Sequence, residues 1–251
     1  MVVHTGEIGR AMKDLESDIR LMLCPYTYMK LRVHSKNKLK DFTDNAGLVD
    51  ATMMILLRSN LDQSTFSICR FPRGPTLHFN IVRYALITDV HKNVERTASV
   101  NKTNPWIPFP VMTGFTDSKE DQAMVSMFQG LFPSIDMEKA NLSGMKRVVE
   151  FSKEEDGLIS IRHYMIERRD PHLSAALRNI DEGKVTDLSK FETVEDYVQS
   201  AEKNKPKKNI CAIKLKEIGP RIDMMFKNLE LGIFNGAVLT EEKEHISKTK
   251  K

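Results

Sequence analysis

The chain has 251 residues, of which 41% are hydrophobic and 29% are charged, and this composition is typical of a folded globular protein. Lysine and arginine outnumber aspartate and glutamate by 38 to 34, so the formal net charge of +4 is compatible with nucleic-acid binding but does not establish it. No apolar run approaches the roughly 20 residues that span a bilayer, and no secretory signal opens the chain, so we expect neither a membrane span nor export.

The first third of the chain is predicted to contain one helix followed by strands. Residues 8–23 carry apolar side chains at helical spacing and predict an amphipathic helix that ends before Pro25. The polar and basic segment 32–45 predicts a loop or a short helix. The apolar, β-branched runs that follow predict a strand pair and then a third strand, at 49–58, 64–71 and 76–82.

The middle of the chain is predicted to be mainly helical. Residues 83–99 and 118–130 have helical periodicity, and the second helix is expected to stop at Gly130. Between them, residues 101–110 are rich in proline and asparagine and predict a loop. A short strand is expected at 111–113.

The C-terminal part is predicted to contain four strands, two short helices and a basic connector. The strands are expected at 145–151, 158–167, 210–217 and 221–231. The helices are expected at 172–180 and 192–202, and the connector at 203–209.

Two distant segments share one pattern. Residues 67–82 and 212–227 each contain a short apolar-alternating run, a Gly-Pro dipeptide and a second alternating run. Proline fixes its own φ and restricts the residue before it, so Gly74–Pro75 and Gly219–Pro220 are each expected between two strands. The repeat predicts an α/β fold made of two similar half-domains.

Several short motifs occur in a fixed order along the chain. They are K-N-K-L-K-D-F at 36–42, G-P-T-L at 74–77, M-F-Q-G-L-F-P at 127–133, R-H-Y at 162–164 and E-I-G-P-R at 217–221. In this order and at this spacing, the chain resembles the Brix-domain family, and most closely its Peter Pan (Ssf) branch. The resemblance extends from about Val3 to Leu239 and implies two α/β halves, each related to anticodon-binding folds.

The resemblance and the repeat together suggest a domain division. We expect an N-terminal helical segment at 1–24, a Brix domain at 25–239 and a charged tail at 240–251. Within the domain, the N-terminal half is expected at about 25–133 and the C-terminal half at about 134–239.

No motif of a known enzyme class occurs in the chain. The sequence lacks a phosphate-binding loop, a dinucleotide-binding glycine motif and the common zinc-protease and serine-hydrolase motifs. Its seven histidines are scattered, and its three cysteines form no Cys-x-x-Cys pair. We therefore expect a protein that is not an enzyme and that has no cofactor and no metal site.

Basic residues are the candidates for RNA binding. Lys36, Lys38 and Lys40 alternate in a segment without acids and suit a phosphate backbone, although a solvated loop that contacts nothing has the same pattern. Arginines beside the Gly-Pro corners can pair with phosphate or with an acid such as Glu217. The candidate RNA-binding residues are Lys36, Lys38, Lys40, Arg70, Arg73, Arg147, Arg162, Lys207, Lys208, Lys214, Lys216 and Arg221.

A further candidate feature combines charge with an aromatic ring. Arg162 and Tyr164 are expected on one face of a strand, where they can offer a stacking surface to unpaired bases, although a tyrosine is more often part of the core. The sequence lacks an aromatic-rich sheet motif, so we expect binding to shape and backbone more than to bases, with a steep dependence on salt.

The resemblance implies a non-enzymatic ribosome biogenesis factor of the nucleus and nucleolus. Such a protein would bind the precursor rRNA of the large ribosomal subunit. It would act with ribosomal proteins, with other assembly factors and with a small dedicated protein partner. The alternatives are a Brix protein of the small-subunit precursor, a protein–protein scaffold without direct RNA contact, and a tRNA-associated accessory module.

Overall fold

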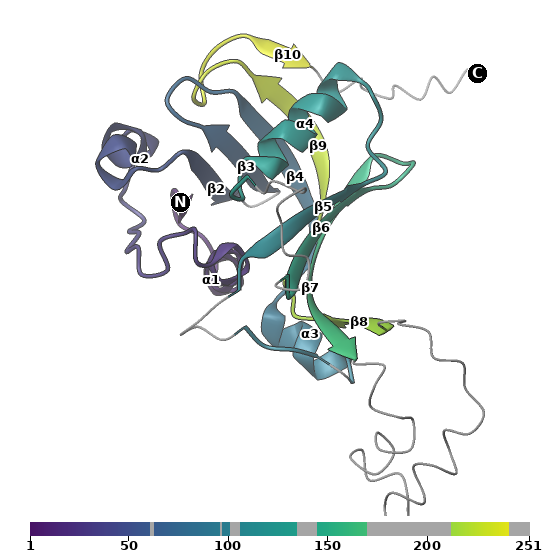
Figure 1. Ribbon diagram of the computed structural model, residues 1–251. Helices are drawn as coiled ribbons and strands as arrows, with labels where there is room; N and C mark the ends of the chain where they lie inside the picture. Colours follow the sequence, from purple (N-terminus) through teal and green to yellow (C-terminus); the bar gives the residue numbers. More distant parts are fainter. Residues whose placement is uncertain (61–62, 96, 101–105, 135–144, 170–211, 241–251) are drawn as a thin grey trace, which may run out of the picture. The chain divides into compact units, whose positions relative to one another are not determined.

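The computed structural model describes residues 1–60, 63–95, 97–100, 106–134, 145–169 and 212–240. It is a mixed α/β structure built on a ten-stranded sheet (Figure 1), which confirms the predicted fold class. The strands are β1 (Val2–His4), β2 (Met53–Ser59), β3 (Ser64–Arg70), β4 (Thr76–Ala85), β5 (Pro108–Thr113), β6 (Arg147–Lys153), β7 (Leu158–Arg169), β8 (Ala212–Glu217), β9 (Arg221–Glu230) and β10 (Val238–Thr240). The helices are α1 (Arg10–Leu23), α2 (Leu39–Asn45), α3 (Ile87–Asn93) and α4 (Lys119–Gln129), with a 3-10 turn η1 (Ala46–Val49).

Two compact units divide the chain. The first consists of Met1–Met165 and Lys216–Lys251, and the second is Ile166–Leu215. Of the second unit, the structure describes only the end of β7 and the start of β8. The helices predicted at 172–180 and 192–202 and the connector at 203–209 lie outside the described residues.

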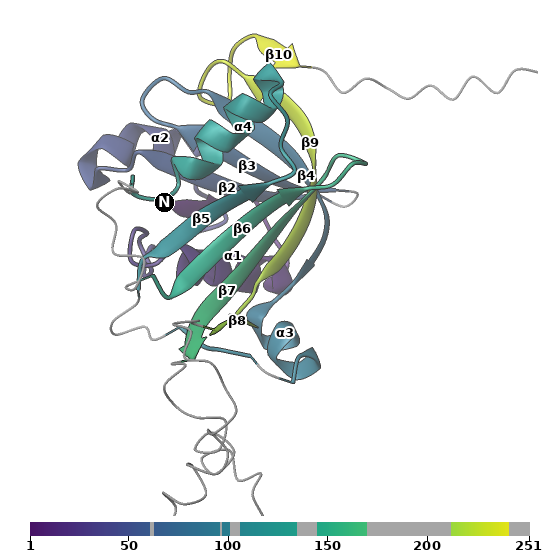
Figure 2. The ribbon, with the colours of Figure 1, turned by 45° about the vertical axis from the view of Figure 1, so that its right-hand side comes forward.

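The strand order of the sheet is β1-β2-β3-β4-β9-β7-β6-β5 (Figure 2), with β10 beside β9 and β8 beside β7. At one edge β1 runs parallel to β2, and at the other edge β5 runs parallel to β6. The remaining neighbours on each side are antiparallel, and the two sets meet where β4 pairs with β9. Apart from α2, η1 and β8, the same strand–helix–strand–strand–strand order therefore occurs twice.

The second set begins with β5 and α4, just as the first begins with β1 and α1. A division at residues 133 and 134 separates α4 from the strands that follow it. We therefore propose that the second half begins near Pro108 and that the first half includes α1.

Each Gly-Pro dipeptide lies between two strands, as predicted. Gly74–Pro75 joins β3 to β4, which pair with each other in an antiparallel hairpin. Gly219–Pro220 joins β8 to β9, and both of these strands pair with β7. The strands after the dipeptides, β4 and β9, occupy matching positions in the sheet, whereas the strands before them do not.

The main hydrophobic core joins α1 and α4 to one face of the sheet. Phe128 of α4 stacks on Phe79 of β4 and on Phe151 of β6, with ring centroids 5.7 Å and 4.5 Å away, so this helix links both strand sets. Alternate residues of a strand point to opposite faces, and Met54 and Leu56 of β2 pack against a second, smaller cluster that includes Phe42 of α2. Burial on both faces explains the unbroken apolar run of β2.

The helix predicted at 83–99 is shorter in the structure. Strand β4 continues to Ala85 because its last residues pair with β9, with Tyr84 opposite Ile222 and Ala85 opposite Arg221. Helix α3 then occupies only Ile87–Asn93. Sheet hydrogen bonds to a distant segment thus outweigh the local helical pattern. No helix among the described residues is long and apolar enough to cross a membrane.

Candidate nucleic-acid interface

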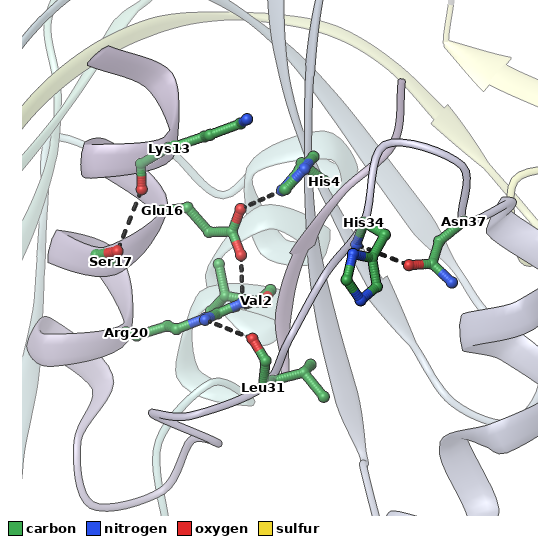
Figure 3. A network of polar contacts seen from close by, with 9 residues as sticks. All are labelled: Val2, His4, Lys13, Glu16, Ser17, Arg20, Leu31, His34 and Asn37. Carbon is green, nitrogen blue, oxygen red and sulfur yellow. Dashed lines mark hydrogen bonds and ion pairs between the residues drawn. The ribbon is translucent and has the colours of Figure 1, made fainter. Parts of the chain in front are cut away.

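A buried polar network fixes the start of the basic segment (Figure 3). Glu16 of α1 is 2.5 Å from Nδ1 of His4 in β1 and also pairs with Arg20. Arg20 in turn donates to a carbonyl of β1 and, at 3.0 Å, to the carbonyl of Leu31. The hydrogen bond from Arg20 therefore holds the chain at Leu31, shortly before the predicted lysines at 36, 38 and 40.

The alternating lysines Lys36, Lys38 and Lys40 are all exposed. The first two lie in the turn before α2, and Lys40 lies in the first turn of that helix. The backbone N–H of Lys38 donates to a carboxylate oxygen of Asp41 at 2.8 Å, which holds the start of the helix in place. These charges are presented by a short, hydrogen-bonded segment at the surface.

The structure brings Lys40 together with Arg73, which lies 33 positions further along the chain. The two side chains line a shallow hollow of about 720 Å³ between α2, the Gly74 turn and the segment at 232–235, and Asp44 lines it too. Arg73 is exposed. Two of the predicted RNA-binding residues thus share one surface, which we call the α2 hollow.

The Gly74 turn holds Arg73 at this surface. Gly74 has a φ of +95°, and a Cβ atom there would lie 2.6 Å from the carbonyl oxygen of Leu231. Only glycine accommodates both this backbone angle and this approach. The next strand residue, Thr76, donates from its hydroxyl to the carbonyl of Gly232 at 2.7 Å and ties the turn to the same neighbouring segment.

Arg147 lies in the interior, which contradicts its prediction as an RNA contact. Its side chain is fully buried, and its Nη atoms donate to the carbonyls of Leu21, Met22, Cys24 and Trp106 at 2.8–3.1 Å. Three of these carbonyls belong to the C-terminal end of α1, where carbonyls lack helical partners and the helix dipole favours a cation. Burial lowers the pKa of Arg147 to about 10, so this residue remains a charged helix cap.

The buried His163 links Arg147 to the second Gly-Pro turn. Its Nδ1 lies 2.8 Å from the carbonyl oxygen of Gly219, and its Nε2 lies 3.2 Å from Nε of Arg147. Since a carbonyl accepts and a guanidinium donates, the imidazole carries its proton on Nδ1 and is neutral. Burial, together with the charge of Arg147, lowers the pKa of His163 to about 3.

A second basic cluster surrounds Asp223 of β9, whose neighbours Ile222 and Met224 face the main core. Nη2 of Arg162 is 2.7 Å from Asp223, Ser160 donates to the same carboxylate, and Arg83 of β4 pairs with it as well. Burial raises the pKa of Asp223, but the hydrogen bonds from Arg83, Ser160 and Arg162 outweigh burial, so the net pKa is lowered. Asp223 thus forms ion pairs with two arginines, and the Arg83 side chain is 71% exposed.

Sequence reasoning missed Arg83. The strand was expected to end at residue 82, so Arg83 fell inside the predicted helix and its position on the sheet was not considered. The pairing of β4 with β9 is irregular between Ile81 and Arg83, which sets Arg83 opposite Asp223 and on the face away from the core, so strand alternation alone does not predict its position.

The remaining predicted residues have different surroundings. Arg221 makes a bidentate pair with Glu217, with both N–O distances at 2.6 Å, which is the acidic pairing that the sequence left as an alternative. Arg70 is half-buried and donates from Nη2 to the carbonyl of Ser126 in the last turn of α4 at 3.1 Å. Lys214 and Lys216 are half-buried on β8, whereas Lys207 and Lys208 lie outside the described residues.

Tyr164 is half-buried beside Arg162 and Arg221, so the stacking-plus-charge pair predicted from the sequence shares one region of the sheet. Burial raises the pKa of Tyr164, with smaller effects of the same sign from Glu217 and Glu150. Within the part of the chain that the structure describes, no group of three or more His, Cys, Asp or Glu side chains could hold a metal ion.

Comparison with known proteins adds a family match that covers most of the chain. The family model of the Brix domain matches residues 6–227. A Brix domain-containing protein of Schizosaccharomyces pombe is 29% identical over 99% of this chain and 76% of its own length. The protein Peter pan of Drosophila melanogaster is 30% identical over 99% of this chain and 59% of its own. Ribosome biogenesis protein SSF1 of Saccharomyces cerevisiae is 33% identical over 76% of this chain, and the match spans 46% of SSF1.

Proposed function

Because this chain belongs to the Brix domain family, we propose that it is a non-enzymatic assembly factor that binds precursor rRNA of the large ribosomal subunit. Its similarity to Peter pan and to the ribosome biogenesis protein SSF1 supports a role in ribosome biogenesis. The assignment to the large subunit follows the Peter Pan branch, as does a location in the nucleus and nucleolus. The proposed partners are ribosomal proteins, other assembly factors and a small dedicated protein.

The observation that carries RNA binding is the α2 hollow. Lys40 and Arg73 reach it from two elements that are distant in sequence, and Lys36 and Lys38 extend the same exposed segment. Clustered, exposed cations that are presented from ordered turns suit the regularly spaced charges of a phosphate backbone. The Asp223 cluster with Arg83 and Arg162 is the second proposed contact region.

The revised RNA-binding set follows from these positions. Arg147 is left out because it is buried, and Arg70 is left out of this set because it does not line the α2 hollow. Arg221 has a weaker claim because Glu217 already occupies its guanidinium. Lys36, Lys38, Lys40 and Arg73 are the main proposed contacts, and Arg83 and Arg162, which share Asp223, form the second region.

A salt titration with matched charge reversals tests the α2 hollow. The triple change Lys36→Glu, Lys38→Glu and Lys40→Glu is compared with Lys13→Glu, Lys92→Glu and Lys119→Glu, which reverses three exposed lysines of α1, α3 and α4. Both variants have the same net charge. Affinity for fragments of large-subunit precursor rRNA is measured by fluorescence anisotropy over a range of salt concentrations.

We expect the first triple to reduce the slope of log affinity against log salt by about 2 to 3, because each lost phosphate contact removes about 0.7–0.9. The matched triple should change the slope much less. Equal effects of the two triples would show that only net charge matters and would remove the α2 hollow from the proposal. A flat slope for the unmodified protein would favour the protein–protein scaffold instead.

In-cell crosslinking with sequencing of the bound RNA tests the choice of subunit. Crosslinks clustered on the large-subunit precursor are the expected result. Crosslinks on the small-subunit precursor would move the chain to another Brix branch, and competition by tRNA would favour the accessory-module alternative. An absence of enriched RNA would contradict direct binding.

A further inference from the structure

A groove of three adjoining hollows lies along the loop after α1, and it was not predicted from the sequence. Its central hollow has a volume of about 440 Å³, with Tyr26 and Tyr28 on one side and Leu131 and Phe132 on the other. A second hollow shares Thr27 and Tyr28 with the first and leads to Lys30. A third shares Gly130, Phe132 and Pro133 with the first and leads to Arg70. We call these three hollows together the tyrosine groove.

The central hollow offers flat aromatic surfaces and one hydroxyl without a partner. Tyr26 is 53% exposed and Tyr28 is 45% exposed, so both side chains are accessible to a ligand. The Tyr28 hydroxyl donates to the carbonyl of Val49, so its ring is held in place. The Thr27 hydroxyl oxygen is buried and has no hydrogen-bond partner among the residues that the structure describes. A planar ligand with an apolar face and polar edges fits such surroundings.

The charges along the groove differ between its ends and its middle. Lys30 lines one end and Arg70 the other, whereas Asp50 lines the central hollow. Nη2 of Arg70 donates to a carbonyl of α4, and a guanidinium has five N–H donors in total. Negatively charged groups are therefore favoured at the ends and disfavoured in the middle.

We propose that the tyrosine groove binds an unpaired nucleotide of single-stranded RNA, with its base stacked on Tyr26 in the central hollow and the flanking phosphates near Lys30 and Arg70. Aromatic stacking of splayed bases between backbone contacts is the usual way in which proteins hold single-stranded RNA. A further hollow shares Asp50 and Thr52 with the central hollow and Thr43 and Pro72 with the α2 hollow, so the two regions adjoin at the surface and one RNA strand can contact both. This inference rests on the proposed RNA-binding function and adds a base contact to it.

The test compares Tyr26→Ala with Tyr26→Phe and with Trp106→Ala. Trp106 is the matched aromatic control, because its ring is 36% exposed, lies over Lys146 and lines none of the three hollows. Affinities are measured for a single-stranded ten-nucleotide RNA and for the same sequence as a duplex. Thermal melting of each variant checks that the fold is retained.

Tyr26→Ala should weaken single-stranded binding by about 5- to 100-fold, as expected for the loss of one base–aromatic stack. Tyr26→Phe, which keeps the ring, and Trp106→Ala should stay within about twofold of the unmodified protein, and duplex affinity should not change in any variant. Photo-crosslinking of the same RNA carrying 4-thiouridine should label the peptide that contains Tyr26.

The outcomes separate this inference from the proposed function. If the unmodified protein binds RNA and Tyr26→Ala binds equally well, the groove is not a base site, but the backbone-binding proposal stands. If Tyr26→Ala loses a protein partner and keeps its RNA affinity, the groove is a protein-docking site and the inference is wrong. If the unmodified protein binds neither RNA, the proposed function itself fails.

Discussion

The glycines of the two Gly-Pro turns have similar backbone conformations but very different surroundings. Gly74 and Gly219 both have positive φ values, of +95° and +84°. Gly74 sits in a hairpin beside the exposed Arg73, whereas Gly219 and its neighbours Ile218 and Pro220 are buried. Val90 of α3 packs over Gly219, and His163 binds its carbonyl.

A repeated dipeptide therefore specifies a local backbone conformation, whereas the residues packed around the turn decide whether it has a binding or a structural role. At the first turn, an arginine faces solvent and is available to a phosphate. At the second, Arg221 pairs with Glu217, and the guanidinium of Arg147 is buried behind His163 and binds helix carbonyls. The same residue type therefore has a proposed binding role at one turn and a structural role at the other.

Of the changes that test this comparison, Arg147→Met should cause the largest loss of stability. The change leaves the carbonyls at the end of α1 without their donor in a buried site, so we expect a loss of about 3–5 kcal/mol in the free energy of unfolding. The matched change Arg73→Met should cost less than about 0.5 kcal/mol, because that side chain is exposed. Urea denaturation measures both. A similar small loss in the two variants would show that the buried cap does not stabilise the fold.

Alanine at the two glycines should separate the turns by a smaller margin. Both changes force a positive φ on a side chain, but the new Cβ would lie 2.6 Å from a backbone oxygen at Gly74 and 3.2 Å from a Val90 methyl at Gly219. We expect losses of about 3 kcal/mol for Gly74→Ala and about 2 kcal/mol for Gly219→Ala. A larger loss at Gly219, measured by the same denaturation, would show that the Leu231 segment yields more easily than α3.

Near neutral pH, a pH dependence at the buried turn should be smaller than either of these losses. The folded pKa of His163 is about 3, whereas the unfolded value is about 6.5. As the pH falls below about 6.5, the unfolded chain binds a proton that the folded protein excludes, so the free energy of unfolding falls by about 1.4 kcal/mol per pH unit until the pH nears 3. His163→Gln lacks the titrating group and should have a shallower slope between pH 6 and 4. Identical slopes would mean that His163 is protonated in the fold.

Local patterns predicted those parts of the fold that are stabilised locally. The alternating runs and turn residues located β2, β3, β6, β7 and β9, because strand alternation and turn chemistry are set by neighbours in sequence. The three-residue strand β1 was missed, since its existence depends on the parallel pairing of Val2 with Ile55. The extra length of β4 likewise depends on β9.

The candidate site shows the same limit. The exposed lysines at 36–40 were predicted because a short segment without acids can be recognised in the sequence alone. The proximity of Lys40 to Arg73, the burial of Arg147 against α1 and the groove between Tyr26 and Phe132 all depend on contacts between distant segments. Charge and spacing alone do not distinguish a helix-capping arginine from one that faces solvent.

The cap formed by Arg147 has a consequence for synthesis of the chain. The guanidinium holds the carbonyl of Cys24, one residue before the loop that carries Tyr26, and it comes from a strand of the other half. Since a chain is made from its N-terminus, this hydrogen bond cannot form until residue 147 has emerged from the ribosome. The end of α1 therefore gains its cap only when part of the second half is present, so a product that stops before residue 147 would lack it.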